Sequence, residues 1–314
     1  MSEKRQRQAV LIMNPSSGKE KAEEIRKSAE AAIAGAGYSV TTRLTEKAGD
    51  AERFAREGTR DGADLVIAAG GDGTVNEAVN GIAGLPERPL FALLPLGTVN
   101  DFARALGIPL DVGEAIQALP DLVPKPADIG MAAGRYFMNI IAIGALAEGV
   151  AGVPVEQKSA FGPLAYIAHG AKALFSAEGN ELQLWHDHGS WSGEASLLLL
   201  ALTNSTGGFE RMNPEAETDD GLLHVTVIKN TKLPNLVRMS AALLLGKLQE
   251  AGAVETFRTK RLRVESDRPL VCNIDGDECG VTPLEVSVLP GHLRVLVPAE
   301  EGGGGEPDER IPNA

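Results

Sequence analysis

Three things are scarce in this sequence: cysteines, long apolar runs and basic charge. Only two cysteines occur among the 314 residues, Cys272 and Cys279, in a stretch with the composition of a strand and a turn. This usage resembles neither a disulfide framework nor a zinc site, and it fits a reducing compartment. The apolar segment Leu197–Leu202 has the length of a buried strand and is far too short to cross a membrane.

The shortage of basic residues gives the chain a formal net charge of −13. This charge argues against a nucleic-acid partner and against a polybasic membrane anchor. The amino terminus lacks the charged and then apolar pattern of a secretory signal, so we expect a cytoplasmic location. No Ser-His-Asp arrangement or nucleophile elbow stands out, and His186 and His188 have no further metal ligands near them in the sequence.

The length suits two domains, each large enough to bury a core. In the first part of the chain, strand-like segments alternate with segments of helical periodicity. The expected strands are Ala9–Met13, Tyr38–Leu44, Leu65–Ala69 and Pro89–Pro95. This alternation predicts a doubly wound, parallel α/β sheet, in which ligands bind outside the carboxyl ends of the strands.

The stretch Leu65–Glu77 is the most informative part of this domain. A buried strand breaks into three glycines around Asp72, and a helix is expected from Thr74, with Glu77 at the spacing of a capping box. Glycines let backbone N–H groups approach an anion, and a helix start adds donors. A carboxylate beside phosphate requires a cation, so Asp72 favours Mg²⁺ with a nucleotide; an ordinary strand-to-helix turn is the alternative.

Three further loops are expected at the same edge of the sheet. They are Asn14–Gly18 after the first strand, Thr45 after the second, and Gly97–Asp101 after the fourth. In the last of these, Asn100 or Asp101 can cap a short helix. Since the carboxyl ends of parallel strands share one edge, four loops are predicted to converge on one nucleotide site.

From about Asp128 the pattern changes to alternating strands with hairpin turns. The expected strands of this part are Met131–Ala133, Tyr136–Ile141, Glu181–Trp185, Ala195–Thr203, His224–Lys229, Glu255–Glu265, Leu270–Ile274, Leu284–Leu289 and Leu293–Val297. Helices are expected at Phe161–Ser176 and Leu233–Glu250. The pattern predicts a mostly antiparallel β-sandwich domain, followed by a disordered tail from Glu300.

Two acidic clusters in this second part contain candidate site residues. Pro214–Leu222 places adjacent carboxylates in a turn, an environment that hard cations prefer. Asn273–Glu278 places three carboxylates where a strand ends, and one of them could accept a proton from an attacking alcohol. A solvated acidic turn and a simple Asp-Gly hairpin explain the two clusters about as well.

Several of these motifs, taken together and in order, resemble the soluble bacterial diacylglycerol-kinase-like lipid kinases. The motifs are Asn14–Gly18, Gly70–Glu77, Pro95–Phe102, Asp219–Gly221 and Asp275–Asp277. The resemblance covers nearly the whole chain. The block Gly97–Asp101 separates this family from NAD kinases and phosphofructokinases, which share only the first glycine block in recognisable form.

The resemblance implies a lipid kinase that uses ATP and Mg²⁺ to transfer the γ-phosphate to a hydroxyl of diacylglycerol or a related lipid alcohol. It implies a nucleotide-binding domain over 1–128, a β-sandwich domain with the lipid and metal site over 129–298, and a disordered tail over 299–314. Residues 293–298 are expected to return to the first domain, and the active site is expected in the interdomain cleft.

The resemblance also assigns roles to individual residues. The nucleotide contacts fall on Asn14, Pro15, Ser16, Ser17, Gly18, Thr45, Gly70, Gly71, Asp72, Gly73, Thr74, Val75, Asn76, Glu77 and Thr98. The structural Mg²⁺ corresponds to Asp220 with main-chain oxygens of Glu217 and Leu222. Asp72 and Asp101 are expected to join Asp220 in an acidic network near the phosphates.

The family's catalytic Asp-Gly-Glu is Asp275-Gly276-Asp277 here, which shortens one carboxylate by a methylene. Both aspartates qualify as the base, with Asp275 named first and Asp277 second, and Glu278 could compensate for the shortening. Two alternatives therefore stay open. The first is a nucleotide-binding regulatory protein with impaired catalysis, and the second is an NAD kinase-like enzyme.

A lipid substrate implies transient contact with the inner membrane surface, and the family leaves a homodimer open. The apolar stretch Ala160–Phe175 is the candidate helix beside the acyl pocket, with a core helix of the second domain as the alternative.

Overall fold

The computed structural model describes residues 5–16, 21–144, 179–205, 215–229 and 254–299. The chain divides into two compact units, Met1–Ala127 with His292–Ala314 (unit 1) and Asp128–Gly291 (unit 2). The expected helices Phe161–Ser176 and Leu233–Glu250 lie outside the described residues, as do the candidate acyl-pocket residues 160–175, Ser17, Gly18 and the tail from Glu300.

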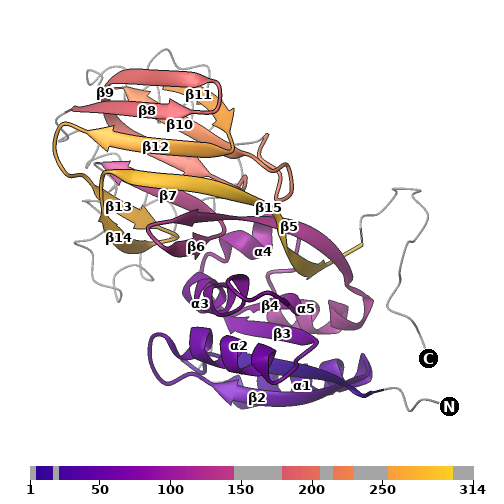
Figure 1. Cartoon of the computed structure of the whole chain (residues 1–314). Coiled ribbons are helices and arrows are strands. Elements are labelled where there is room, and N and C mark those ends of the chain that lie inside the picture. Colours follow the sequence, from indigo (N-terminus) through magenta and orange to yellow (C-terminus); the bar gives the residue numbers. More distant parts are fainter. Residues whose placement is uncertain (1–4, 17–20, 145–178, 206–214, 230–253, 300–314) are drawn as a thin grey trace. The chain divides into compact units, whose positions relative to one another are not determined.

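Unit 1 alternates strands and helices along the chain (Figure 1). Its elements are β1 (Arg7–Met13), α1 (Ala22–Gly35), β2 (Tyr38–Leu44), α2 (Asp50–Arg60), β3 (Leu65–Gly70), α3 (Asp72–Ala83), β4 (Leu90–Pro95), α4 (Asp101–Ala105), α5 (Val112–Ala118) and a 3₁₀ turn (Leu119–Asp121). All four expected strands are present, so the predicted α/β class of this part is confirmed.

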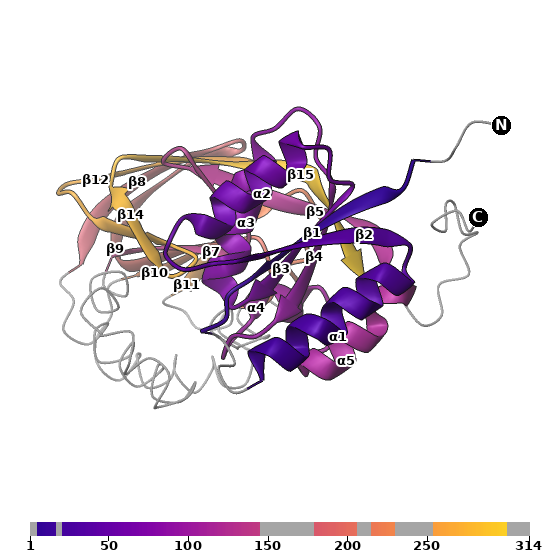
Figure 2. The same ribbon diagram turned by 90° about the horizontal axis from the view of Figure 1, so that it is seen from below.

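The four strands form a parallel sheet in the order β2-β1-β3-β4. The end of β15 (Leu284–Val297) extends the sheet beside β4, where Val295 pairs in parallel with Phe91. Helices α2 and α3 cover one face, and α1 with α5 covers the other (Figure 2). Because both faces are covered, β3 is buried along its whole length and has an uninterrupted apolar sequence. The order reverses between β1 and β3, which makes the edge beside them the expected ligand site.

The predicted capping box at Thr74 and Glu77 is wrong. Helix α3 begins at Asp72, and its N-cap is Gly71, which has no side chain to donate or accept a cap bond. The Glu77 carboxylate instead accepts hydrogen bonds from the backbone N–H groups of Gly49 (2.9 Å) and Ala51 (3.2 Å) at the start of α2. Helices α2 and α3 are neighbours, so Glu77 satisfies donors of the adjacent helix rather than of its own.

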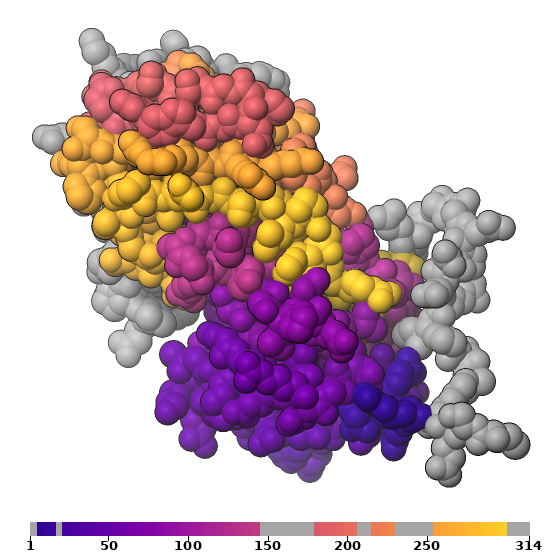
Figure 3. Space-filling model, in the orientation of Figure 1, coloured from indigo at the N-terminus to yellow at the C-terminus, as the bar shows by residue number. Residues whose placement is uncertain are grey.

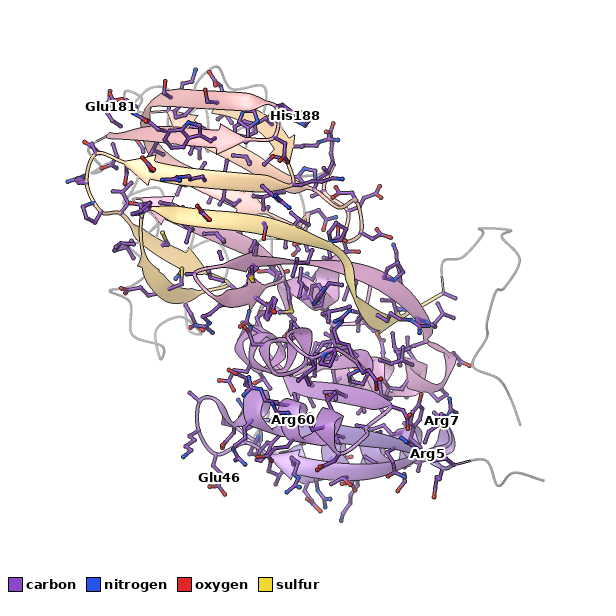
Figure 4. The ribbon with its side chains drawn as sticks, viewed as in Figure 1. Arg5, Arg7, Glu46, Arg60, Glu181 and His188 are labelled. Atoms are coloured by element: carbon purple, nitrogen blue, oxygen red, sulfur yellow. The ribbon has the colours of Figure 1, made fainter. Side chains whose placement is uncertain are left out.

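Arginines hold the opposite end of the sheet, where β1 begins (Figure 4). The Arg7 guanidinium lies 4.4 Å from the centroid of the Tyr38 ring and donates to the carbonyl of Ala36 at 2.9 Å. Arg5 donates to the carbonyl of Gly62 at 2.6 Å. These contacts hold the amino-terminal ends of the strands in place. The polar loops lie at the opposite, carboxyl ends of the strands.

The described part of unit 2 consists mainly of antiparallel strands. They are β5 (Val123–Ala132, which begins in unit 1), β6 (Arg135–Phe137), β7 (Ile140–Gly144), β8 (Asn180–His186), β9 (Gly189–Ala201), β10 (Leu223–Lys229), β11 (Val254–Thr259), β12 (Arg261–Ser266), β13 (Val271–Ile274), β14 (Asp277–Val281) and the first part of β15. The strand order β14-β13-β7-β9-β8-β12-β15 is extended by β10, which pairs with β9 and β11. In the space-filling view β8, β12 and β15 lie side by side (Figure 3).

The long strand β9 organises the core of unit 2. Its first half pairs with β8, and its second half pairs with both β7 and β10. The run Leu197–Ala201 in that second half is buried, and its alternate residues Leu198 and Leu200 join a core with inward residues of β7, β8, β10, β12, β13 and β15. The expected antiparallel sandwich domain is therefore confirmed. No helix among the described residues is long and apolar enough to span a membrane.

Several strand boundaries differ from the expectation. The expected strand Met131–Ala133 is the end of the longer β5, and the expected strand Tyr136–Ile141 is divided between β6 and β7. The segment Glu255–Glu265 is broken into β11 and β12 rather than forming one strand, because the Asp187 carboxylate accepts hydrogen bonds from the N–H groups of Lys260 (2.7 Å) and Arg261 (3.2 Å). These bonds lower the pKa of Asp187, and they turn the backbone between the strands. Conversely, Leu284–Val297 is one continuous strand where two were expected, and β14 was not predicted.

Gly81 allows α2 and α3 to pack closely. A Cβ at this position would strike the carbonyl oxygen of Glu52 and lie 2.8 Å from the Cβ of Ala55. We therefore predict that Gly81→Ala lowers the free energy of unfolding by about 1 to 3 kcal/mol, the usual range for overpacking. Gly35→Ala is the matched control, since it meets no atom within 4 Å at the end of α1. Equal urea midpoints for the two variants would contradict this account.

Candidate functional site

The four polar loops of unit 1 lie at one edge of the sheet. Met13 at the end of β1 pairs with Leu44 of β2 and Ala69 of β3, and Gly70 pairs with Pro95 of β4. All four strands therefore end at the same level. This is the edge that a doubly wound sheet uses for ligands, and the polar loops follow these strand ends.

Backbone hydrogen bonds tie each loop to its neighbouring strand. The N–H of Asn14 donates to Ala69, that of Thr45 to Met13 and that of Leu96 to Gly70, each at 2.9 Å to the carbonyl oxygen. The loops consequently begin in a fixed position relative to one another. A phosphate-binding edge requires loops in fixed positions. Their backbone N–H groups can then point at an anion without the entropy loss of ordering the loops on binding.

The two glycine loops touch each other. A Cβ on Gly97 would lie 2.6 Å from the Cα of Gly71, and a Cβ on Gly71 would lie 3.2 Å from the Cα of Gly97. A side chain at position 97 requires the backbone at Gly71 to move, and one at position 71 makes a tight contact that requires a shift of a few tenths of an ångström. The glycines at 71 and 97 are therefore required by the close approach of two loops as well as by any ligand.

Asp72 joins the same two loops through its carboxylate. Its Oδ2 accepts a hydrogen bond from the backbone N–H of Asn100 at 2.9 Å. Asn100 has a left-handed backbone conformation with φ of 55°, and its side chain bonds to both the N–H (3.0 Å) and the carbonyl (2.9 Å) of Gly97. Asn100 is thus the N-cap residue of α4 but does not cap it with its side chain. Asp101 is the first residue of α4.

The first loop reaches the glycine loop more loosely. The Asn14 amide lies 3.5 Å from the Thr74 hydroxyl, and its Oδ1 accepts bonds from the N–H (3.0 Å) and hydroxyl (2.6 Å) of Ser16. Thr74 also sits against Gly70, where an added Cβ would lie 2.5 Å from the Thr74 side chain. These contacts bring four of the predicted nucleotide residues together in unit 1.

The other predicted nucleotide residues in unit 1 are placed differently. Val75 and Asn76 are buried in α3, Thr98 and Gly73 are exposed, and Glu77 is committed to the start of α2. Pro15 and Thr45 are half-buried beside the strand ends. Since the side chains of Val75 and Asn76 are buried, a contact from these two positions to a ligand would come from the backbone.

In unit 2, Asp220 holds the turn that was expected to bind a cation. Its Oδ1 accepts from the N–H of Leu222 at 2.8 Å, and its Oδ2 lies 2.7 Å from Nε2 of His224. Burial acts to raise the pKa of Asp220, but the hydrogen bonds from His224 and from the N–H of Leu222 outweigh it, so the pKa is lowered. The carboxylate stays ionised and oriented.

Asp128 is a buried carboxylate that the sequence reasoning missed. It is 3% exposed and accepts hydrogen bonds from the N–H groups of Gly221 (2.5 Å) and Gly291 (2.7 Å). Burial raises the pKa of Asp128, while the two N–H bonds act in the opposite direction. The signal in the sequence was an aspartate inside the apolar run Ala127–Gly130. Its position fixes the turn that carries Asp220.

The residues of this turn fit a magnesium ion. Mg²⁺ takes oxygen ligands, keeps several waters and is usually held by only one or two carboxylates. The turn offers the oriented carboxylate of Asp220 and the main-chain carbonyls of Glu217 and Leu222. His224 supplies the kind of neighbouring hydrogen bond that orients a ligating carboxylate.

Asp275 is held by three backbone donors. Its Oδ2 accepts from the N–H of Met138 at 2.8 Å, and its Oδ1 accepts from the N–H groups of Asn139 (3.0 Å) and Ile140 (2.9 Å). Asp275 itself has φ of 47° at the turn between β13 and β14. The carboxylate therefore joins this turn to the start of β7.

Asp277 and Glu278 lie on the other side of the same turn. Both are exposed, in contrast to the half-buried Asp275. The hairpin consequently presents one carboxylate that supports the backbone and two that face solvent.

The chain matches two family descriptions in succession. Residues 8–132 match the diacylglycerol kinase catalytic domain, and residues 142–297 match the YegS C-terminal NAD kinase beta sandwich-like domain. The diacylglycerol kinase of Bacillus subtilis (strain 168) is 37% identical over 296 residues, which cover 94% of this chain and 98% of that protein. The chain belongs to the diacylglycerol-kinase-like family of lipid kinases.

Other members of the family give the same result. The diacylglycerol kinase of Staphylococcus aureus (strain MRSA252) is 36% identical over 292 residues, 93% of each chain. The crystal structure of a diacylglycerol kinase from Bacillus anthracis (strain Sterne) superposes with a TM-score of 0.80 at 27% identity, over 92% of this chain and 96% of that one. The resemblance inferred from the motifs and the two-part fold class are confirmed.

The backbone donors on Asp275 predict a stability effect. We expect Asp275→Ala to lower the free energy of unfolding by about 2 to 3 kcal/mol, because N–H groups of Met138, Asn139 and Ile140 lose their acceptor. Asp277→Ala is the matched control and should change the free energy of unfolding by about 0.5 kcal/mol or less, as surface substitutions usually do. Thermal and urea unfolding of both variants measure the difference. Equal losses would refute the supporting role of Asp275.

Proposed function

We propose that this kinase transfers the γ-phosphate of ATP to the hydroxyl of diacylglycerol or a related lipid alcohol, with Mg²⁺ at the site. The observation that carries the proposal is the contact between the loops at Gly71 and Gly97, bridged by Asp72. This contact uses the second glycine loop, the feature that distinguishes the lipid-kinase resemblance from NAD kinases.

The nucleotide residues are proposed to act mainly through their backbone. The start of α3, from Gly71 to Thr74, offers N–H donors and the positive end of a helix to a phosphate group. The adjacent loops supply two further proposed nucleotide contacts. One is the segment Asn14–Ser16, which continues in sequence to Ser17 and Gly18, and the other is Thr98. Asp72 and Asp101 are proposed to lie beside the phosphates, where their carboxylates bind the water and the metal ion around the phosphate groups.

The proposed metal residues are Asp220 and the carbonyl oxygens of Glu217 and Leu222. A bound Mg²⁺ would supply positive charge that neutralises phosphate oxygens during transfer. What the chain itself contributes is a turn that is already shaped before binding. Asp128 holds Gly221, and His224 orients Asp220.

We further propose that Asp277 accepts the proton of the lipid hydroxyl and that Asp275 positions the hairpin. Each oxygen of Asp275 already accepts a backbone hydrogen bond, and protonating that carboxylate would weaken these bonds. Asp277 is exposed one residue beyond Gly276 and is available to an approaching hydroxyl. The hydroxyl oxygen then attacks the γ-phosphorus as its proton passes to Asp277, while the bond from the γ-phosphorus to the β–γ bridging oxygen breaks and ADP leaves.

Substitution of the solvent-facing carboxylates tests the proposed function. Asp277→Ala should reduce ATP-dependent phosphorylation of diacylglycerol by about 10² to 10⁴-fold, the usual contribution of a general base, with unfolding unchanged. Glu278→Ala, its exposed neighbour, should keep most of the turnover, and Asp277→Glu should restore the family's longer side chain with activity retained. Labelled phosphate from ATP, followed into a panel of lipid alcohols, measures all three.

The same assay separates the alternatives. ATP binding by the native chain without any lipid product would favour a catalytically impaired regulatory protein, and formation of NADP from NAD would favour an NAD kinase. Either result, with a folded protein, would reject lipid phosphorylation as the function. A product from only one lipid alcohol would identify the substrate.

Mg²⁺ binding can be tested without turnover. Mg²⁺ should raise the thermal midpoint of the native chain, since a ligand that binds only the folded state stabilises it. Asp220→Ala should lose most of this Mg²⁺-induced increase, whatever its effect on the midpoint without metal. Asp219→Ala, the adjacent carboxylate, should retain the increase. Equal increases in the two variants would place the metal elsewhere.

A further inference from the structure

We infer that Cys272 and Cys279 form an oxidisable dithiol site that closes into a disulfide across the β13–β14 hairpin. The two residues bracket the turn that carries Asp275 and Asp277. They are the only cysteines of the chain. Both are free thiols in the structure.

The hairpin brings the two thiols to the same side. Cys272 pairs with Gly280 and Asn273 with Glu278, so Cys279 is the extra residue of a bulge in β14. A bulge changes the direction of the side chain it carries. Cys279 packs against the core cluster that contains Cys272. The two side chains therefore face the same core from paired strands of one hairpin.

The two thiols have different chemical environments. The hydrogen bond from Cys272 lowers the pKa of Cys279; burial opposes this shift, and the positive charge of Arg135 adds to it. The same hydrogen bond, together with burial, raises the pKa of Cys272. Cys279 is half-buried, whereas Cys272 is 0% exposed. An oxidant from solvent therefore meets the more acidic and more accessible sulfur first, which is the arrangement of a reactive thiol beside a resolving one.

The reaction needs a two-electron oxidant of the hydroperoxide class. The Cys279 thiolate attacks one peroxide oxygen, the O–O bond breaks, and a sulfenic acid forms with release of water. The Cys272 sulfur then attacks the sulfenic sulfur, and the hydroxyl leaves as a second water. Two thiols and hydrogen peroxide thus give one disulfide and two waters, with both electrons passing to the peroxide.

Disulfide formation would tighten the bulge next to the proposed base. A disulfide with an S–S bond of about 2.05 Å fixes the two Cβ atoms about 3.8 Å apart, so it constrains the Cys279 backbone against β13. Glu278 and Asp277 directly precede it in the chain. Oxidation is therefore expected to displace the carboxylates of the hairpin, a consequence that rests on the proposed function.

Intact-mass measurement tests the site itself. The reduced native chain, treated with hydrogen peroxide, should lose about 2 Da, recover this mass with a thiol reductant, and give a cross-linked peptide that contains both cysteines. Cys272→Ser should stop at a sulfenic acid that dimedone traps, and Cys279→Ser should react much more slowly. A sulfenic acid without a cross-link in the native chain, or disulfide-linked dimers, would overturn the inference.

Turnover in the same samples tests the consequence separately. Oxidised native chain should phosphorylate lipid about tenfold more slowly than reduced chain, because small displacements of reacting groups are costly, and it should recover on reduction. The double variant Cys272→Ser with Cys279→Ser should be insensitive to peroxide. A cross-linked chain with undiminished turnover would reject the effect on catalysis. A reduced chain without turnover would reject the proposed function, while the mass result still decides whether the dithiol site exists.

Discussion

A carboxylate that accepts hydrogen bonds from backbone N–H groups is the interaction on which both units depend. Asp72 holds the backbone of the second glycine loop, Asp275 holds the start of β7, and Asp128 holds the turn of the candidate metal site. Asp187 and Glu77 do the same at a strand break and at a helix start. Turns and helix starts leave donors without partners, and these side chains supply the missing acceptors. Part of the chain's negative charge therefore serves its own architecture.

This use of charge makes acidic motifs difficult to interpret from sequence alone. The aspartate in a glycine loop predicts a ligand site at Asp72, and the structure adds that its carboxylate also joins two loops. At Asp275 the three backbone donors make a supporting role the simpler interpretation of the carboxylate. A sequence shows that a carboxylate is present, but which of its oxygens are occupied depends on segments far away in the chain, such as Met138–Ile140 for Asp275.

Much of the fold could be predicted because local patterns decide it. The alternation of buried strands with amphipathic helices located β1 to β4 and the helices between them, and the change of pattern near Asp128 coincides with the boundary between the two units. The elements that were missed depend on distant contacts. The break between β11 and β12 is imposed by Asp187, and β14 is a short exposed strand with a bulge and a glycine. The capping box failed because the helix starts two residues earlier, at Asp72, with Gly71 as its N-cap.

The mutual contact of Gly71 and Gly97 has an evolutionary consequence. A Cβ at position 97 meets the backbone at Gly71 at 2.6 Å, and a Cβ at position 71 lies only 3.2 Å from the backbone at Gly97. A substitution in one loop therefore also acts on the conformation of the other. A descendant of this chain with one of these glycines replaced would need a changed conformation in both loops. The hydrogen bond by which Asp72 joins the two loops would change as well. Among its relatives, the two positions should be retained together or lost together.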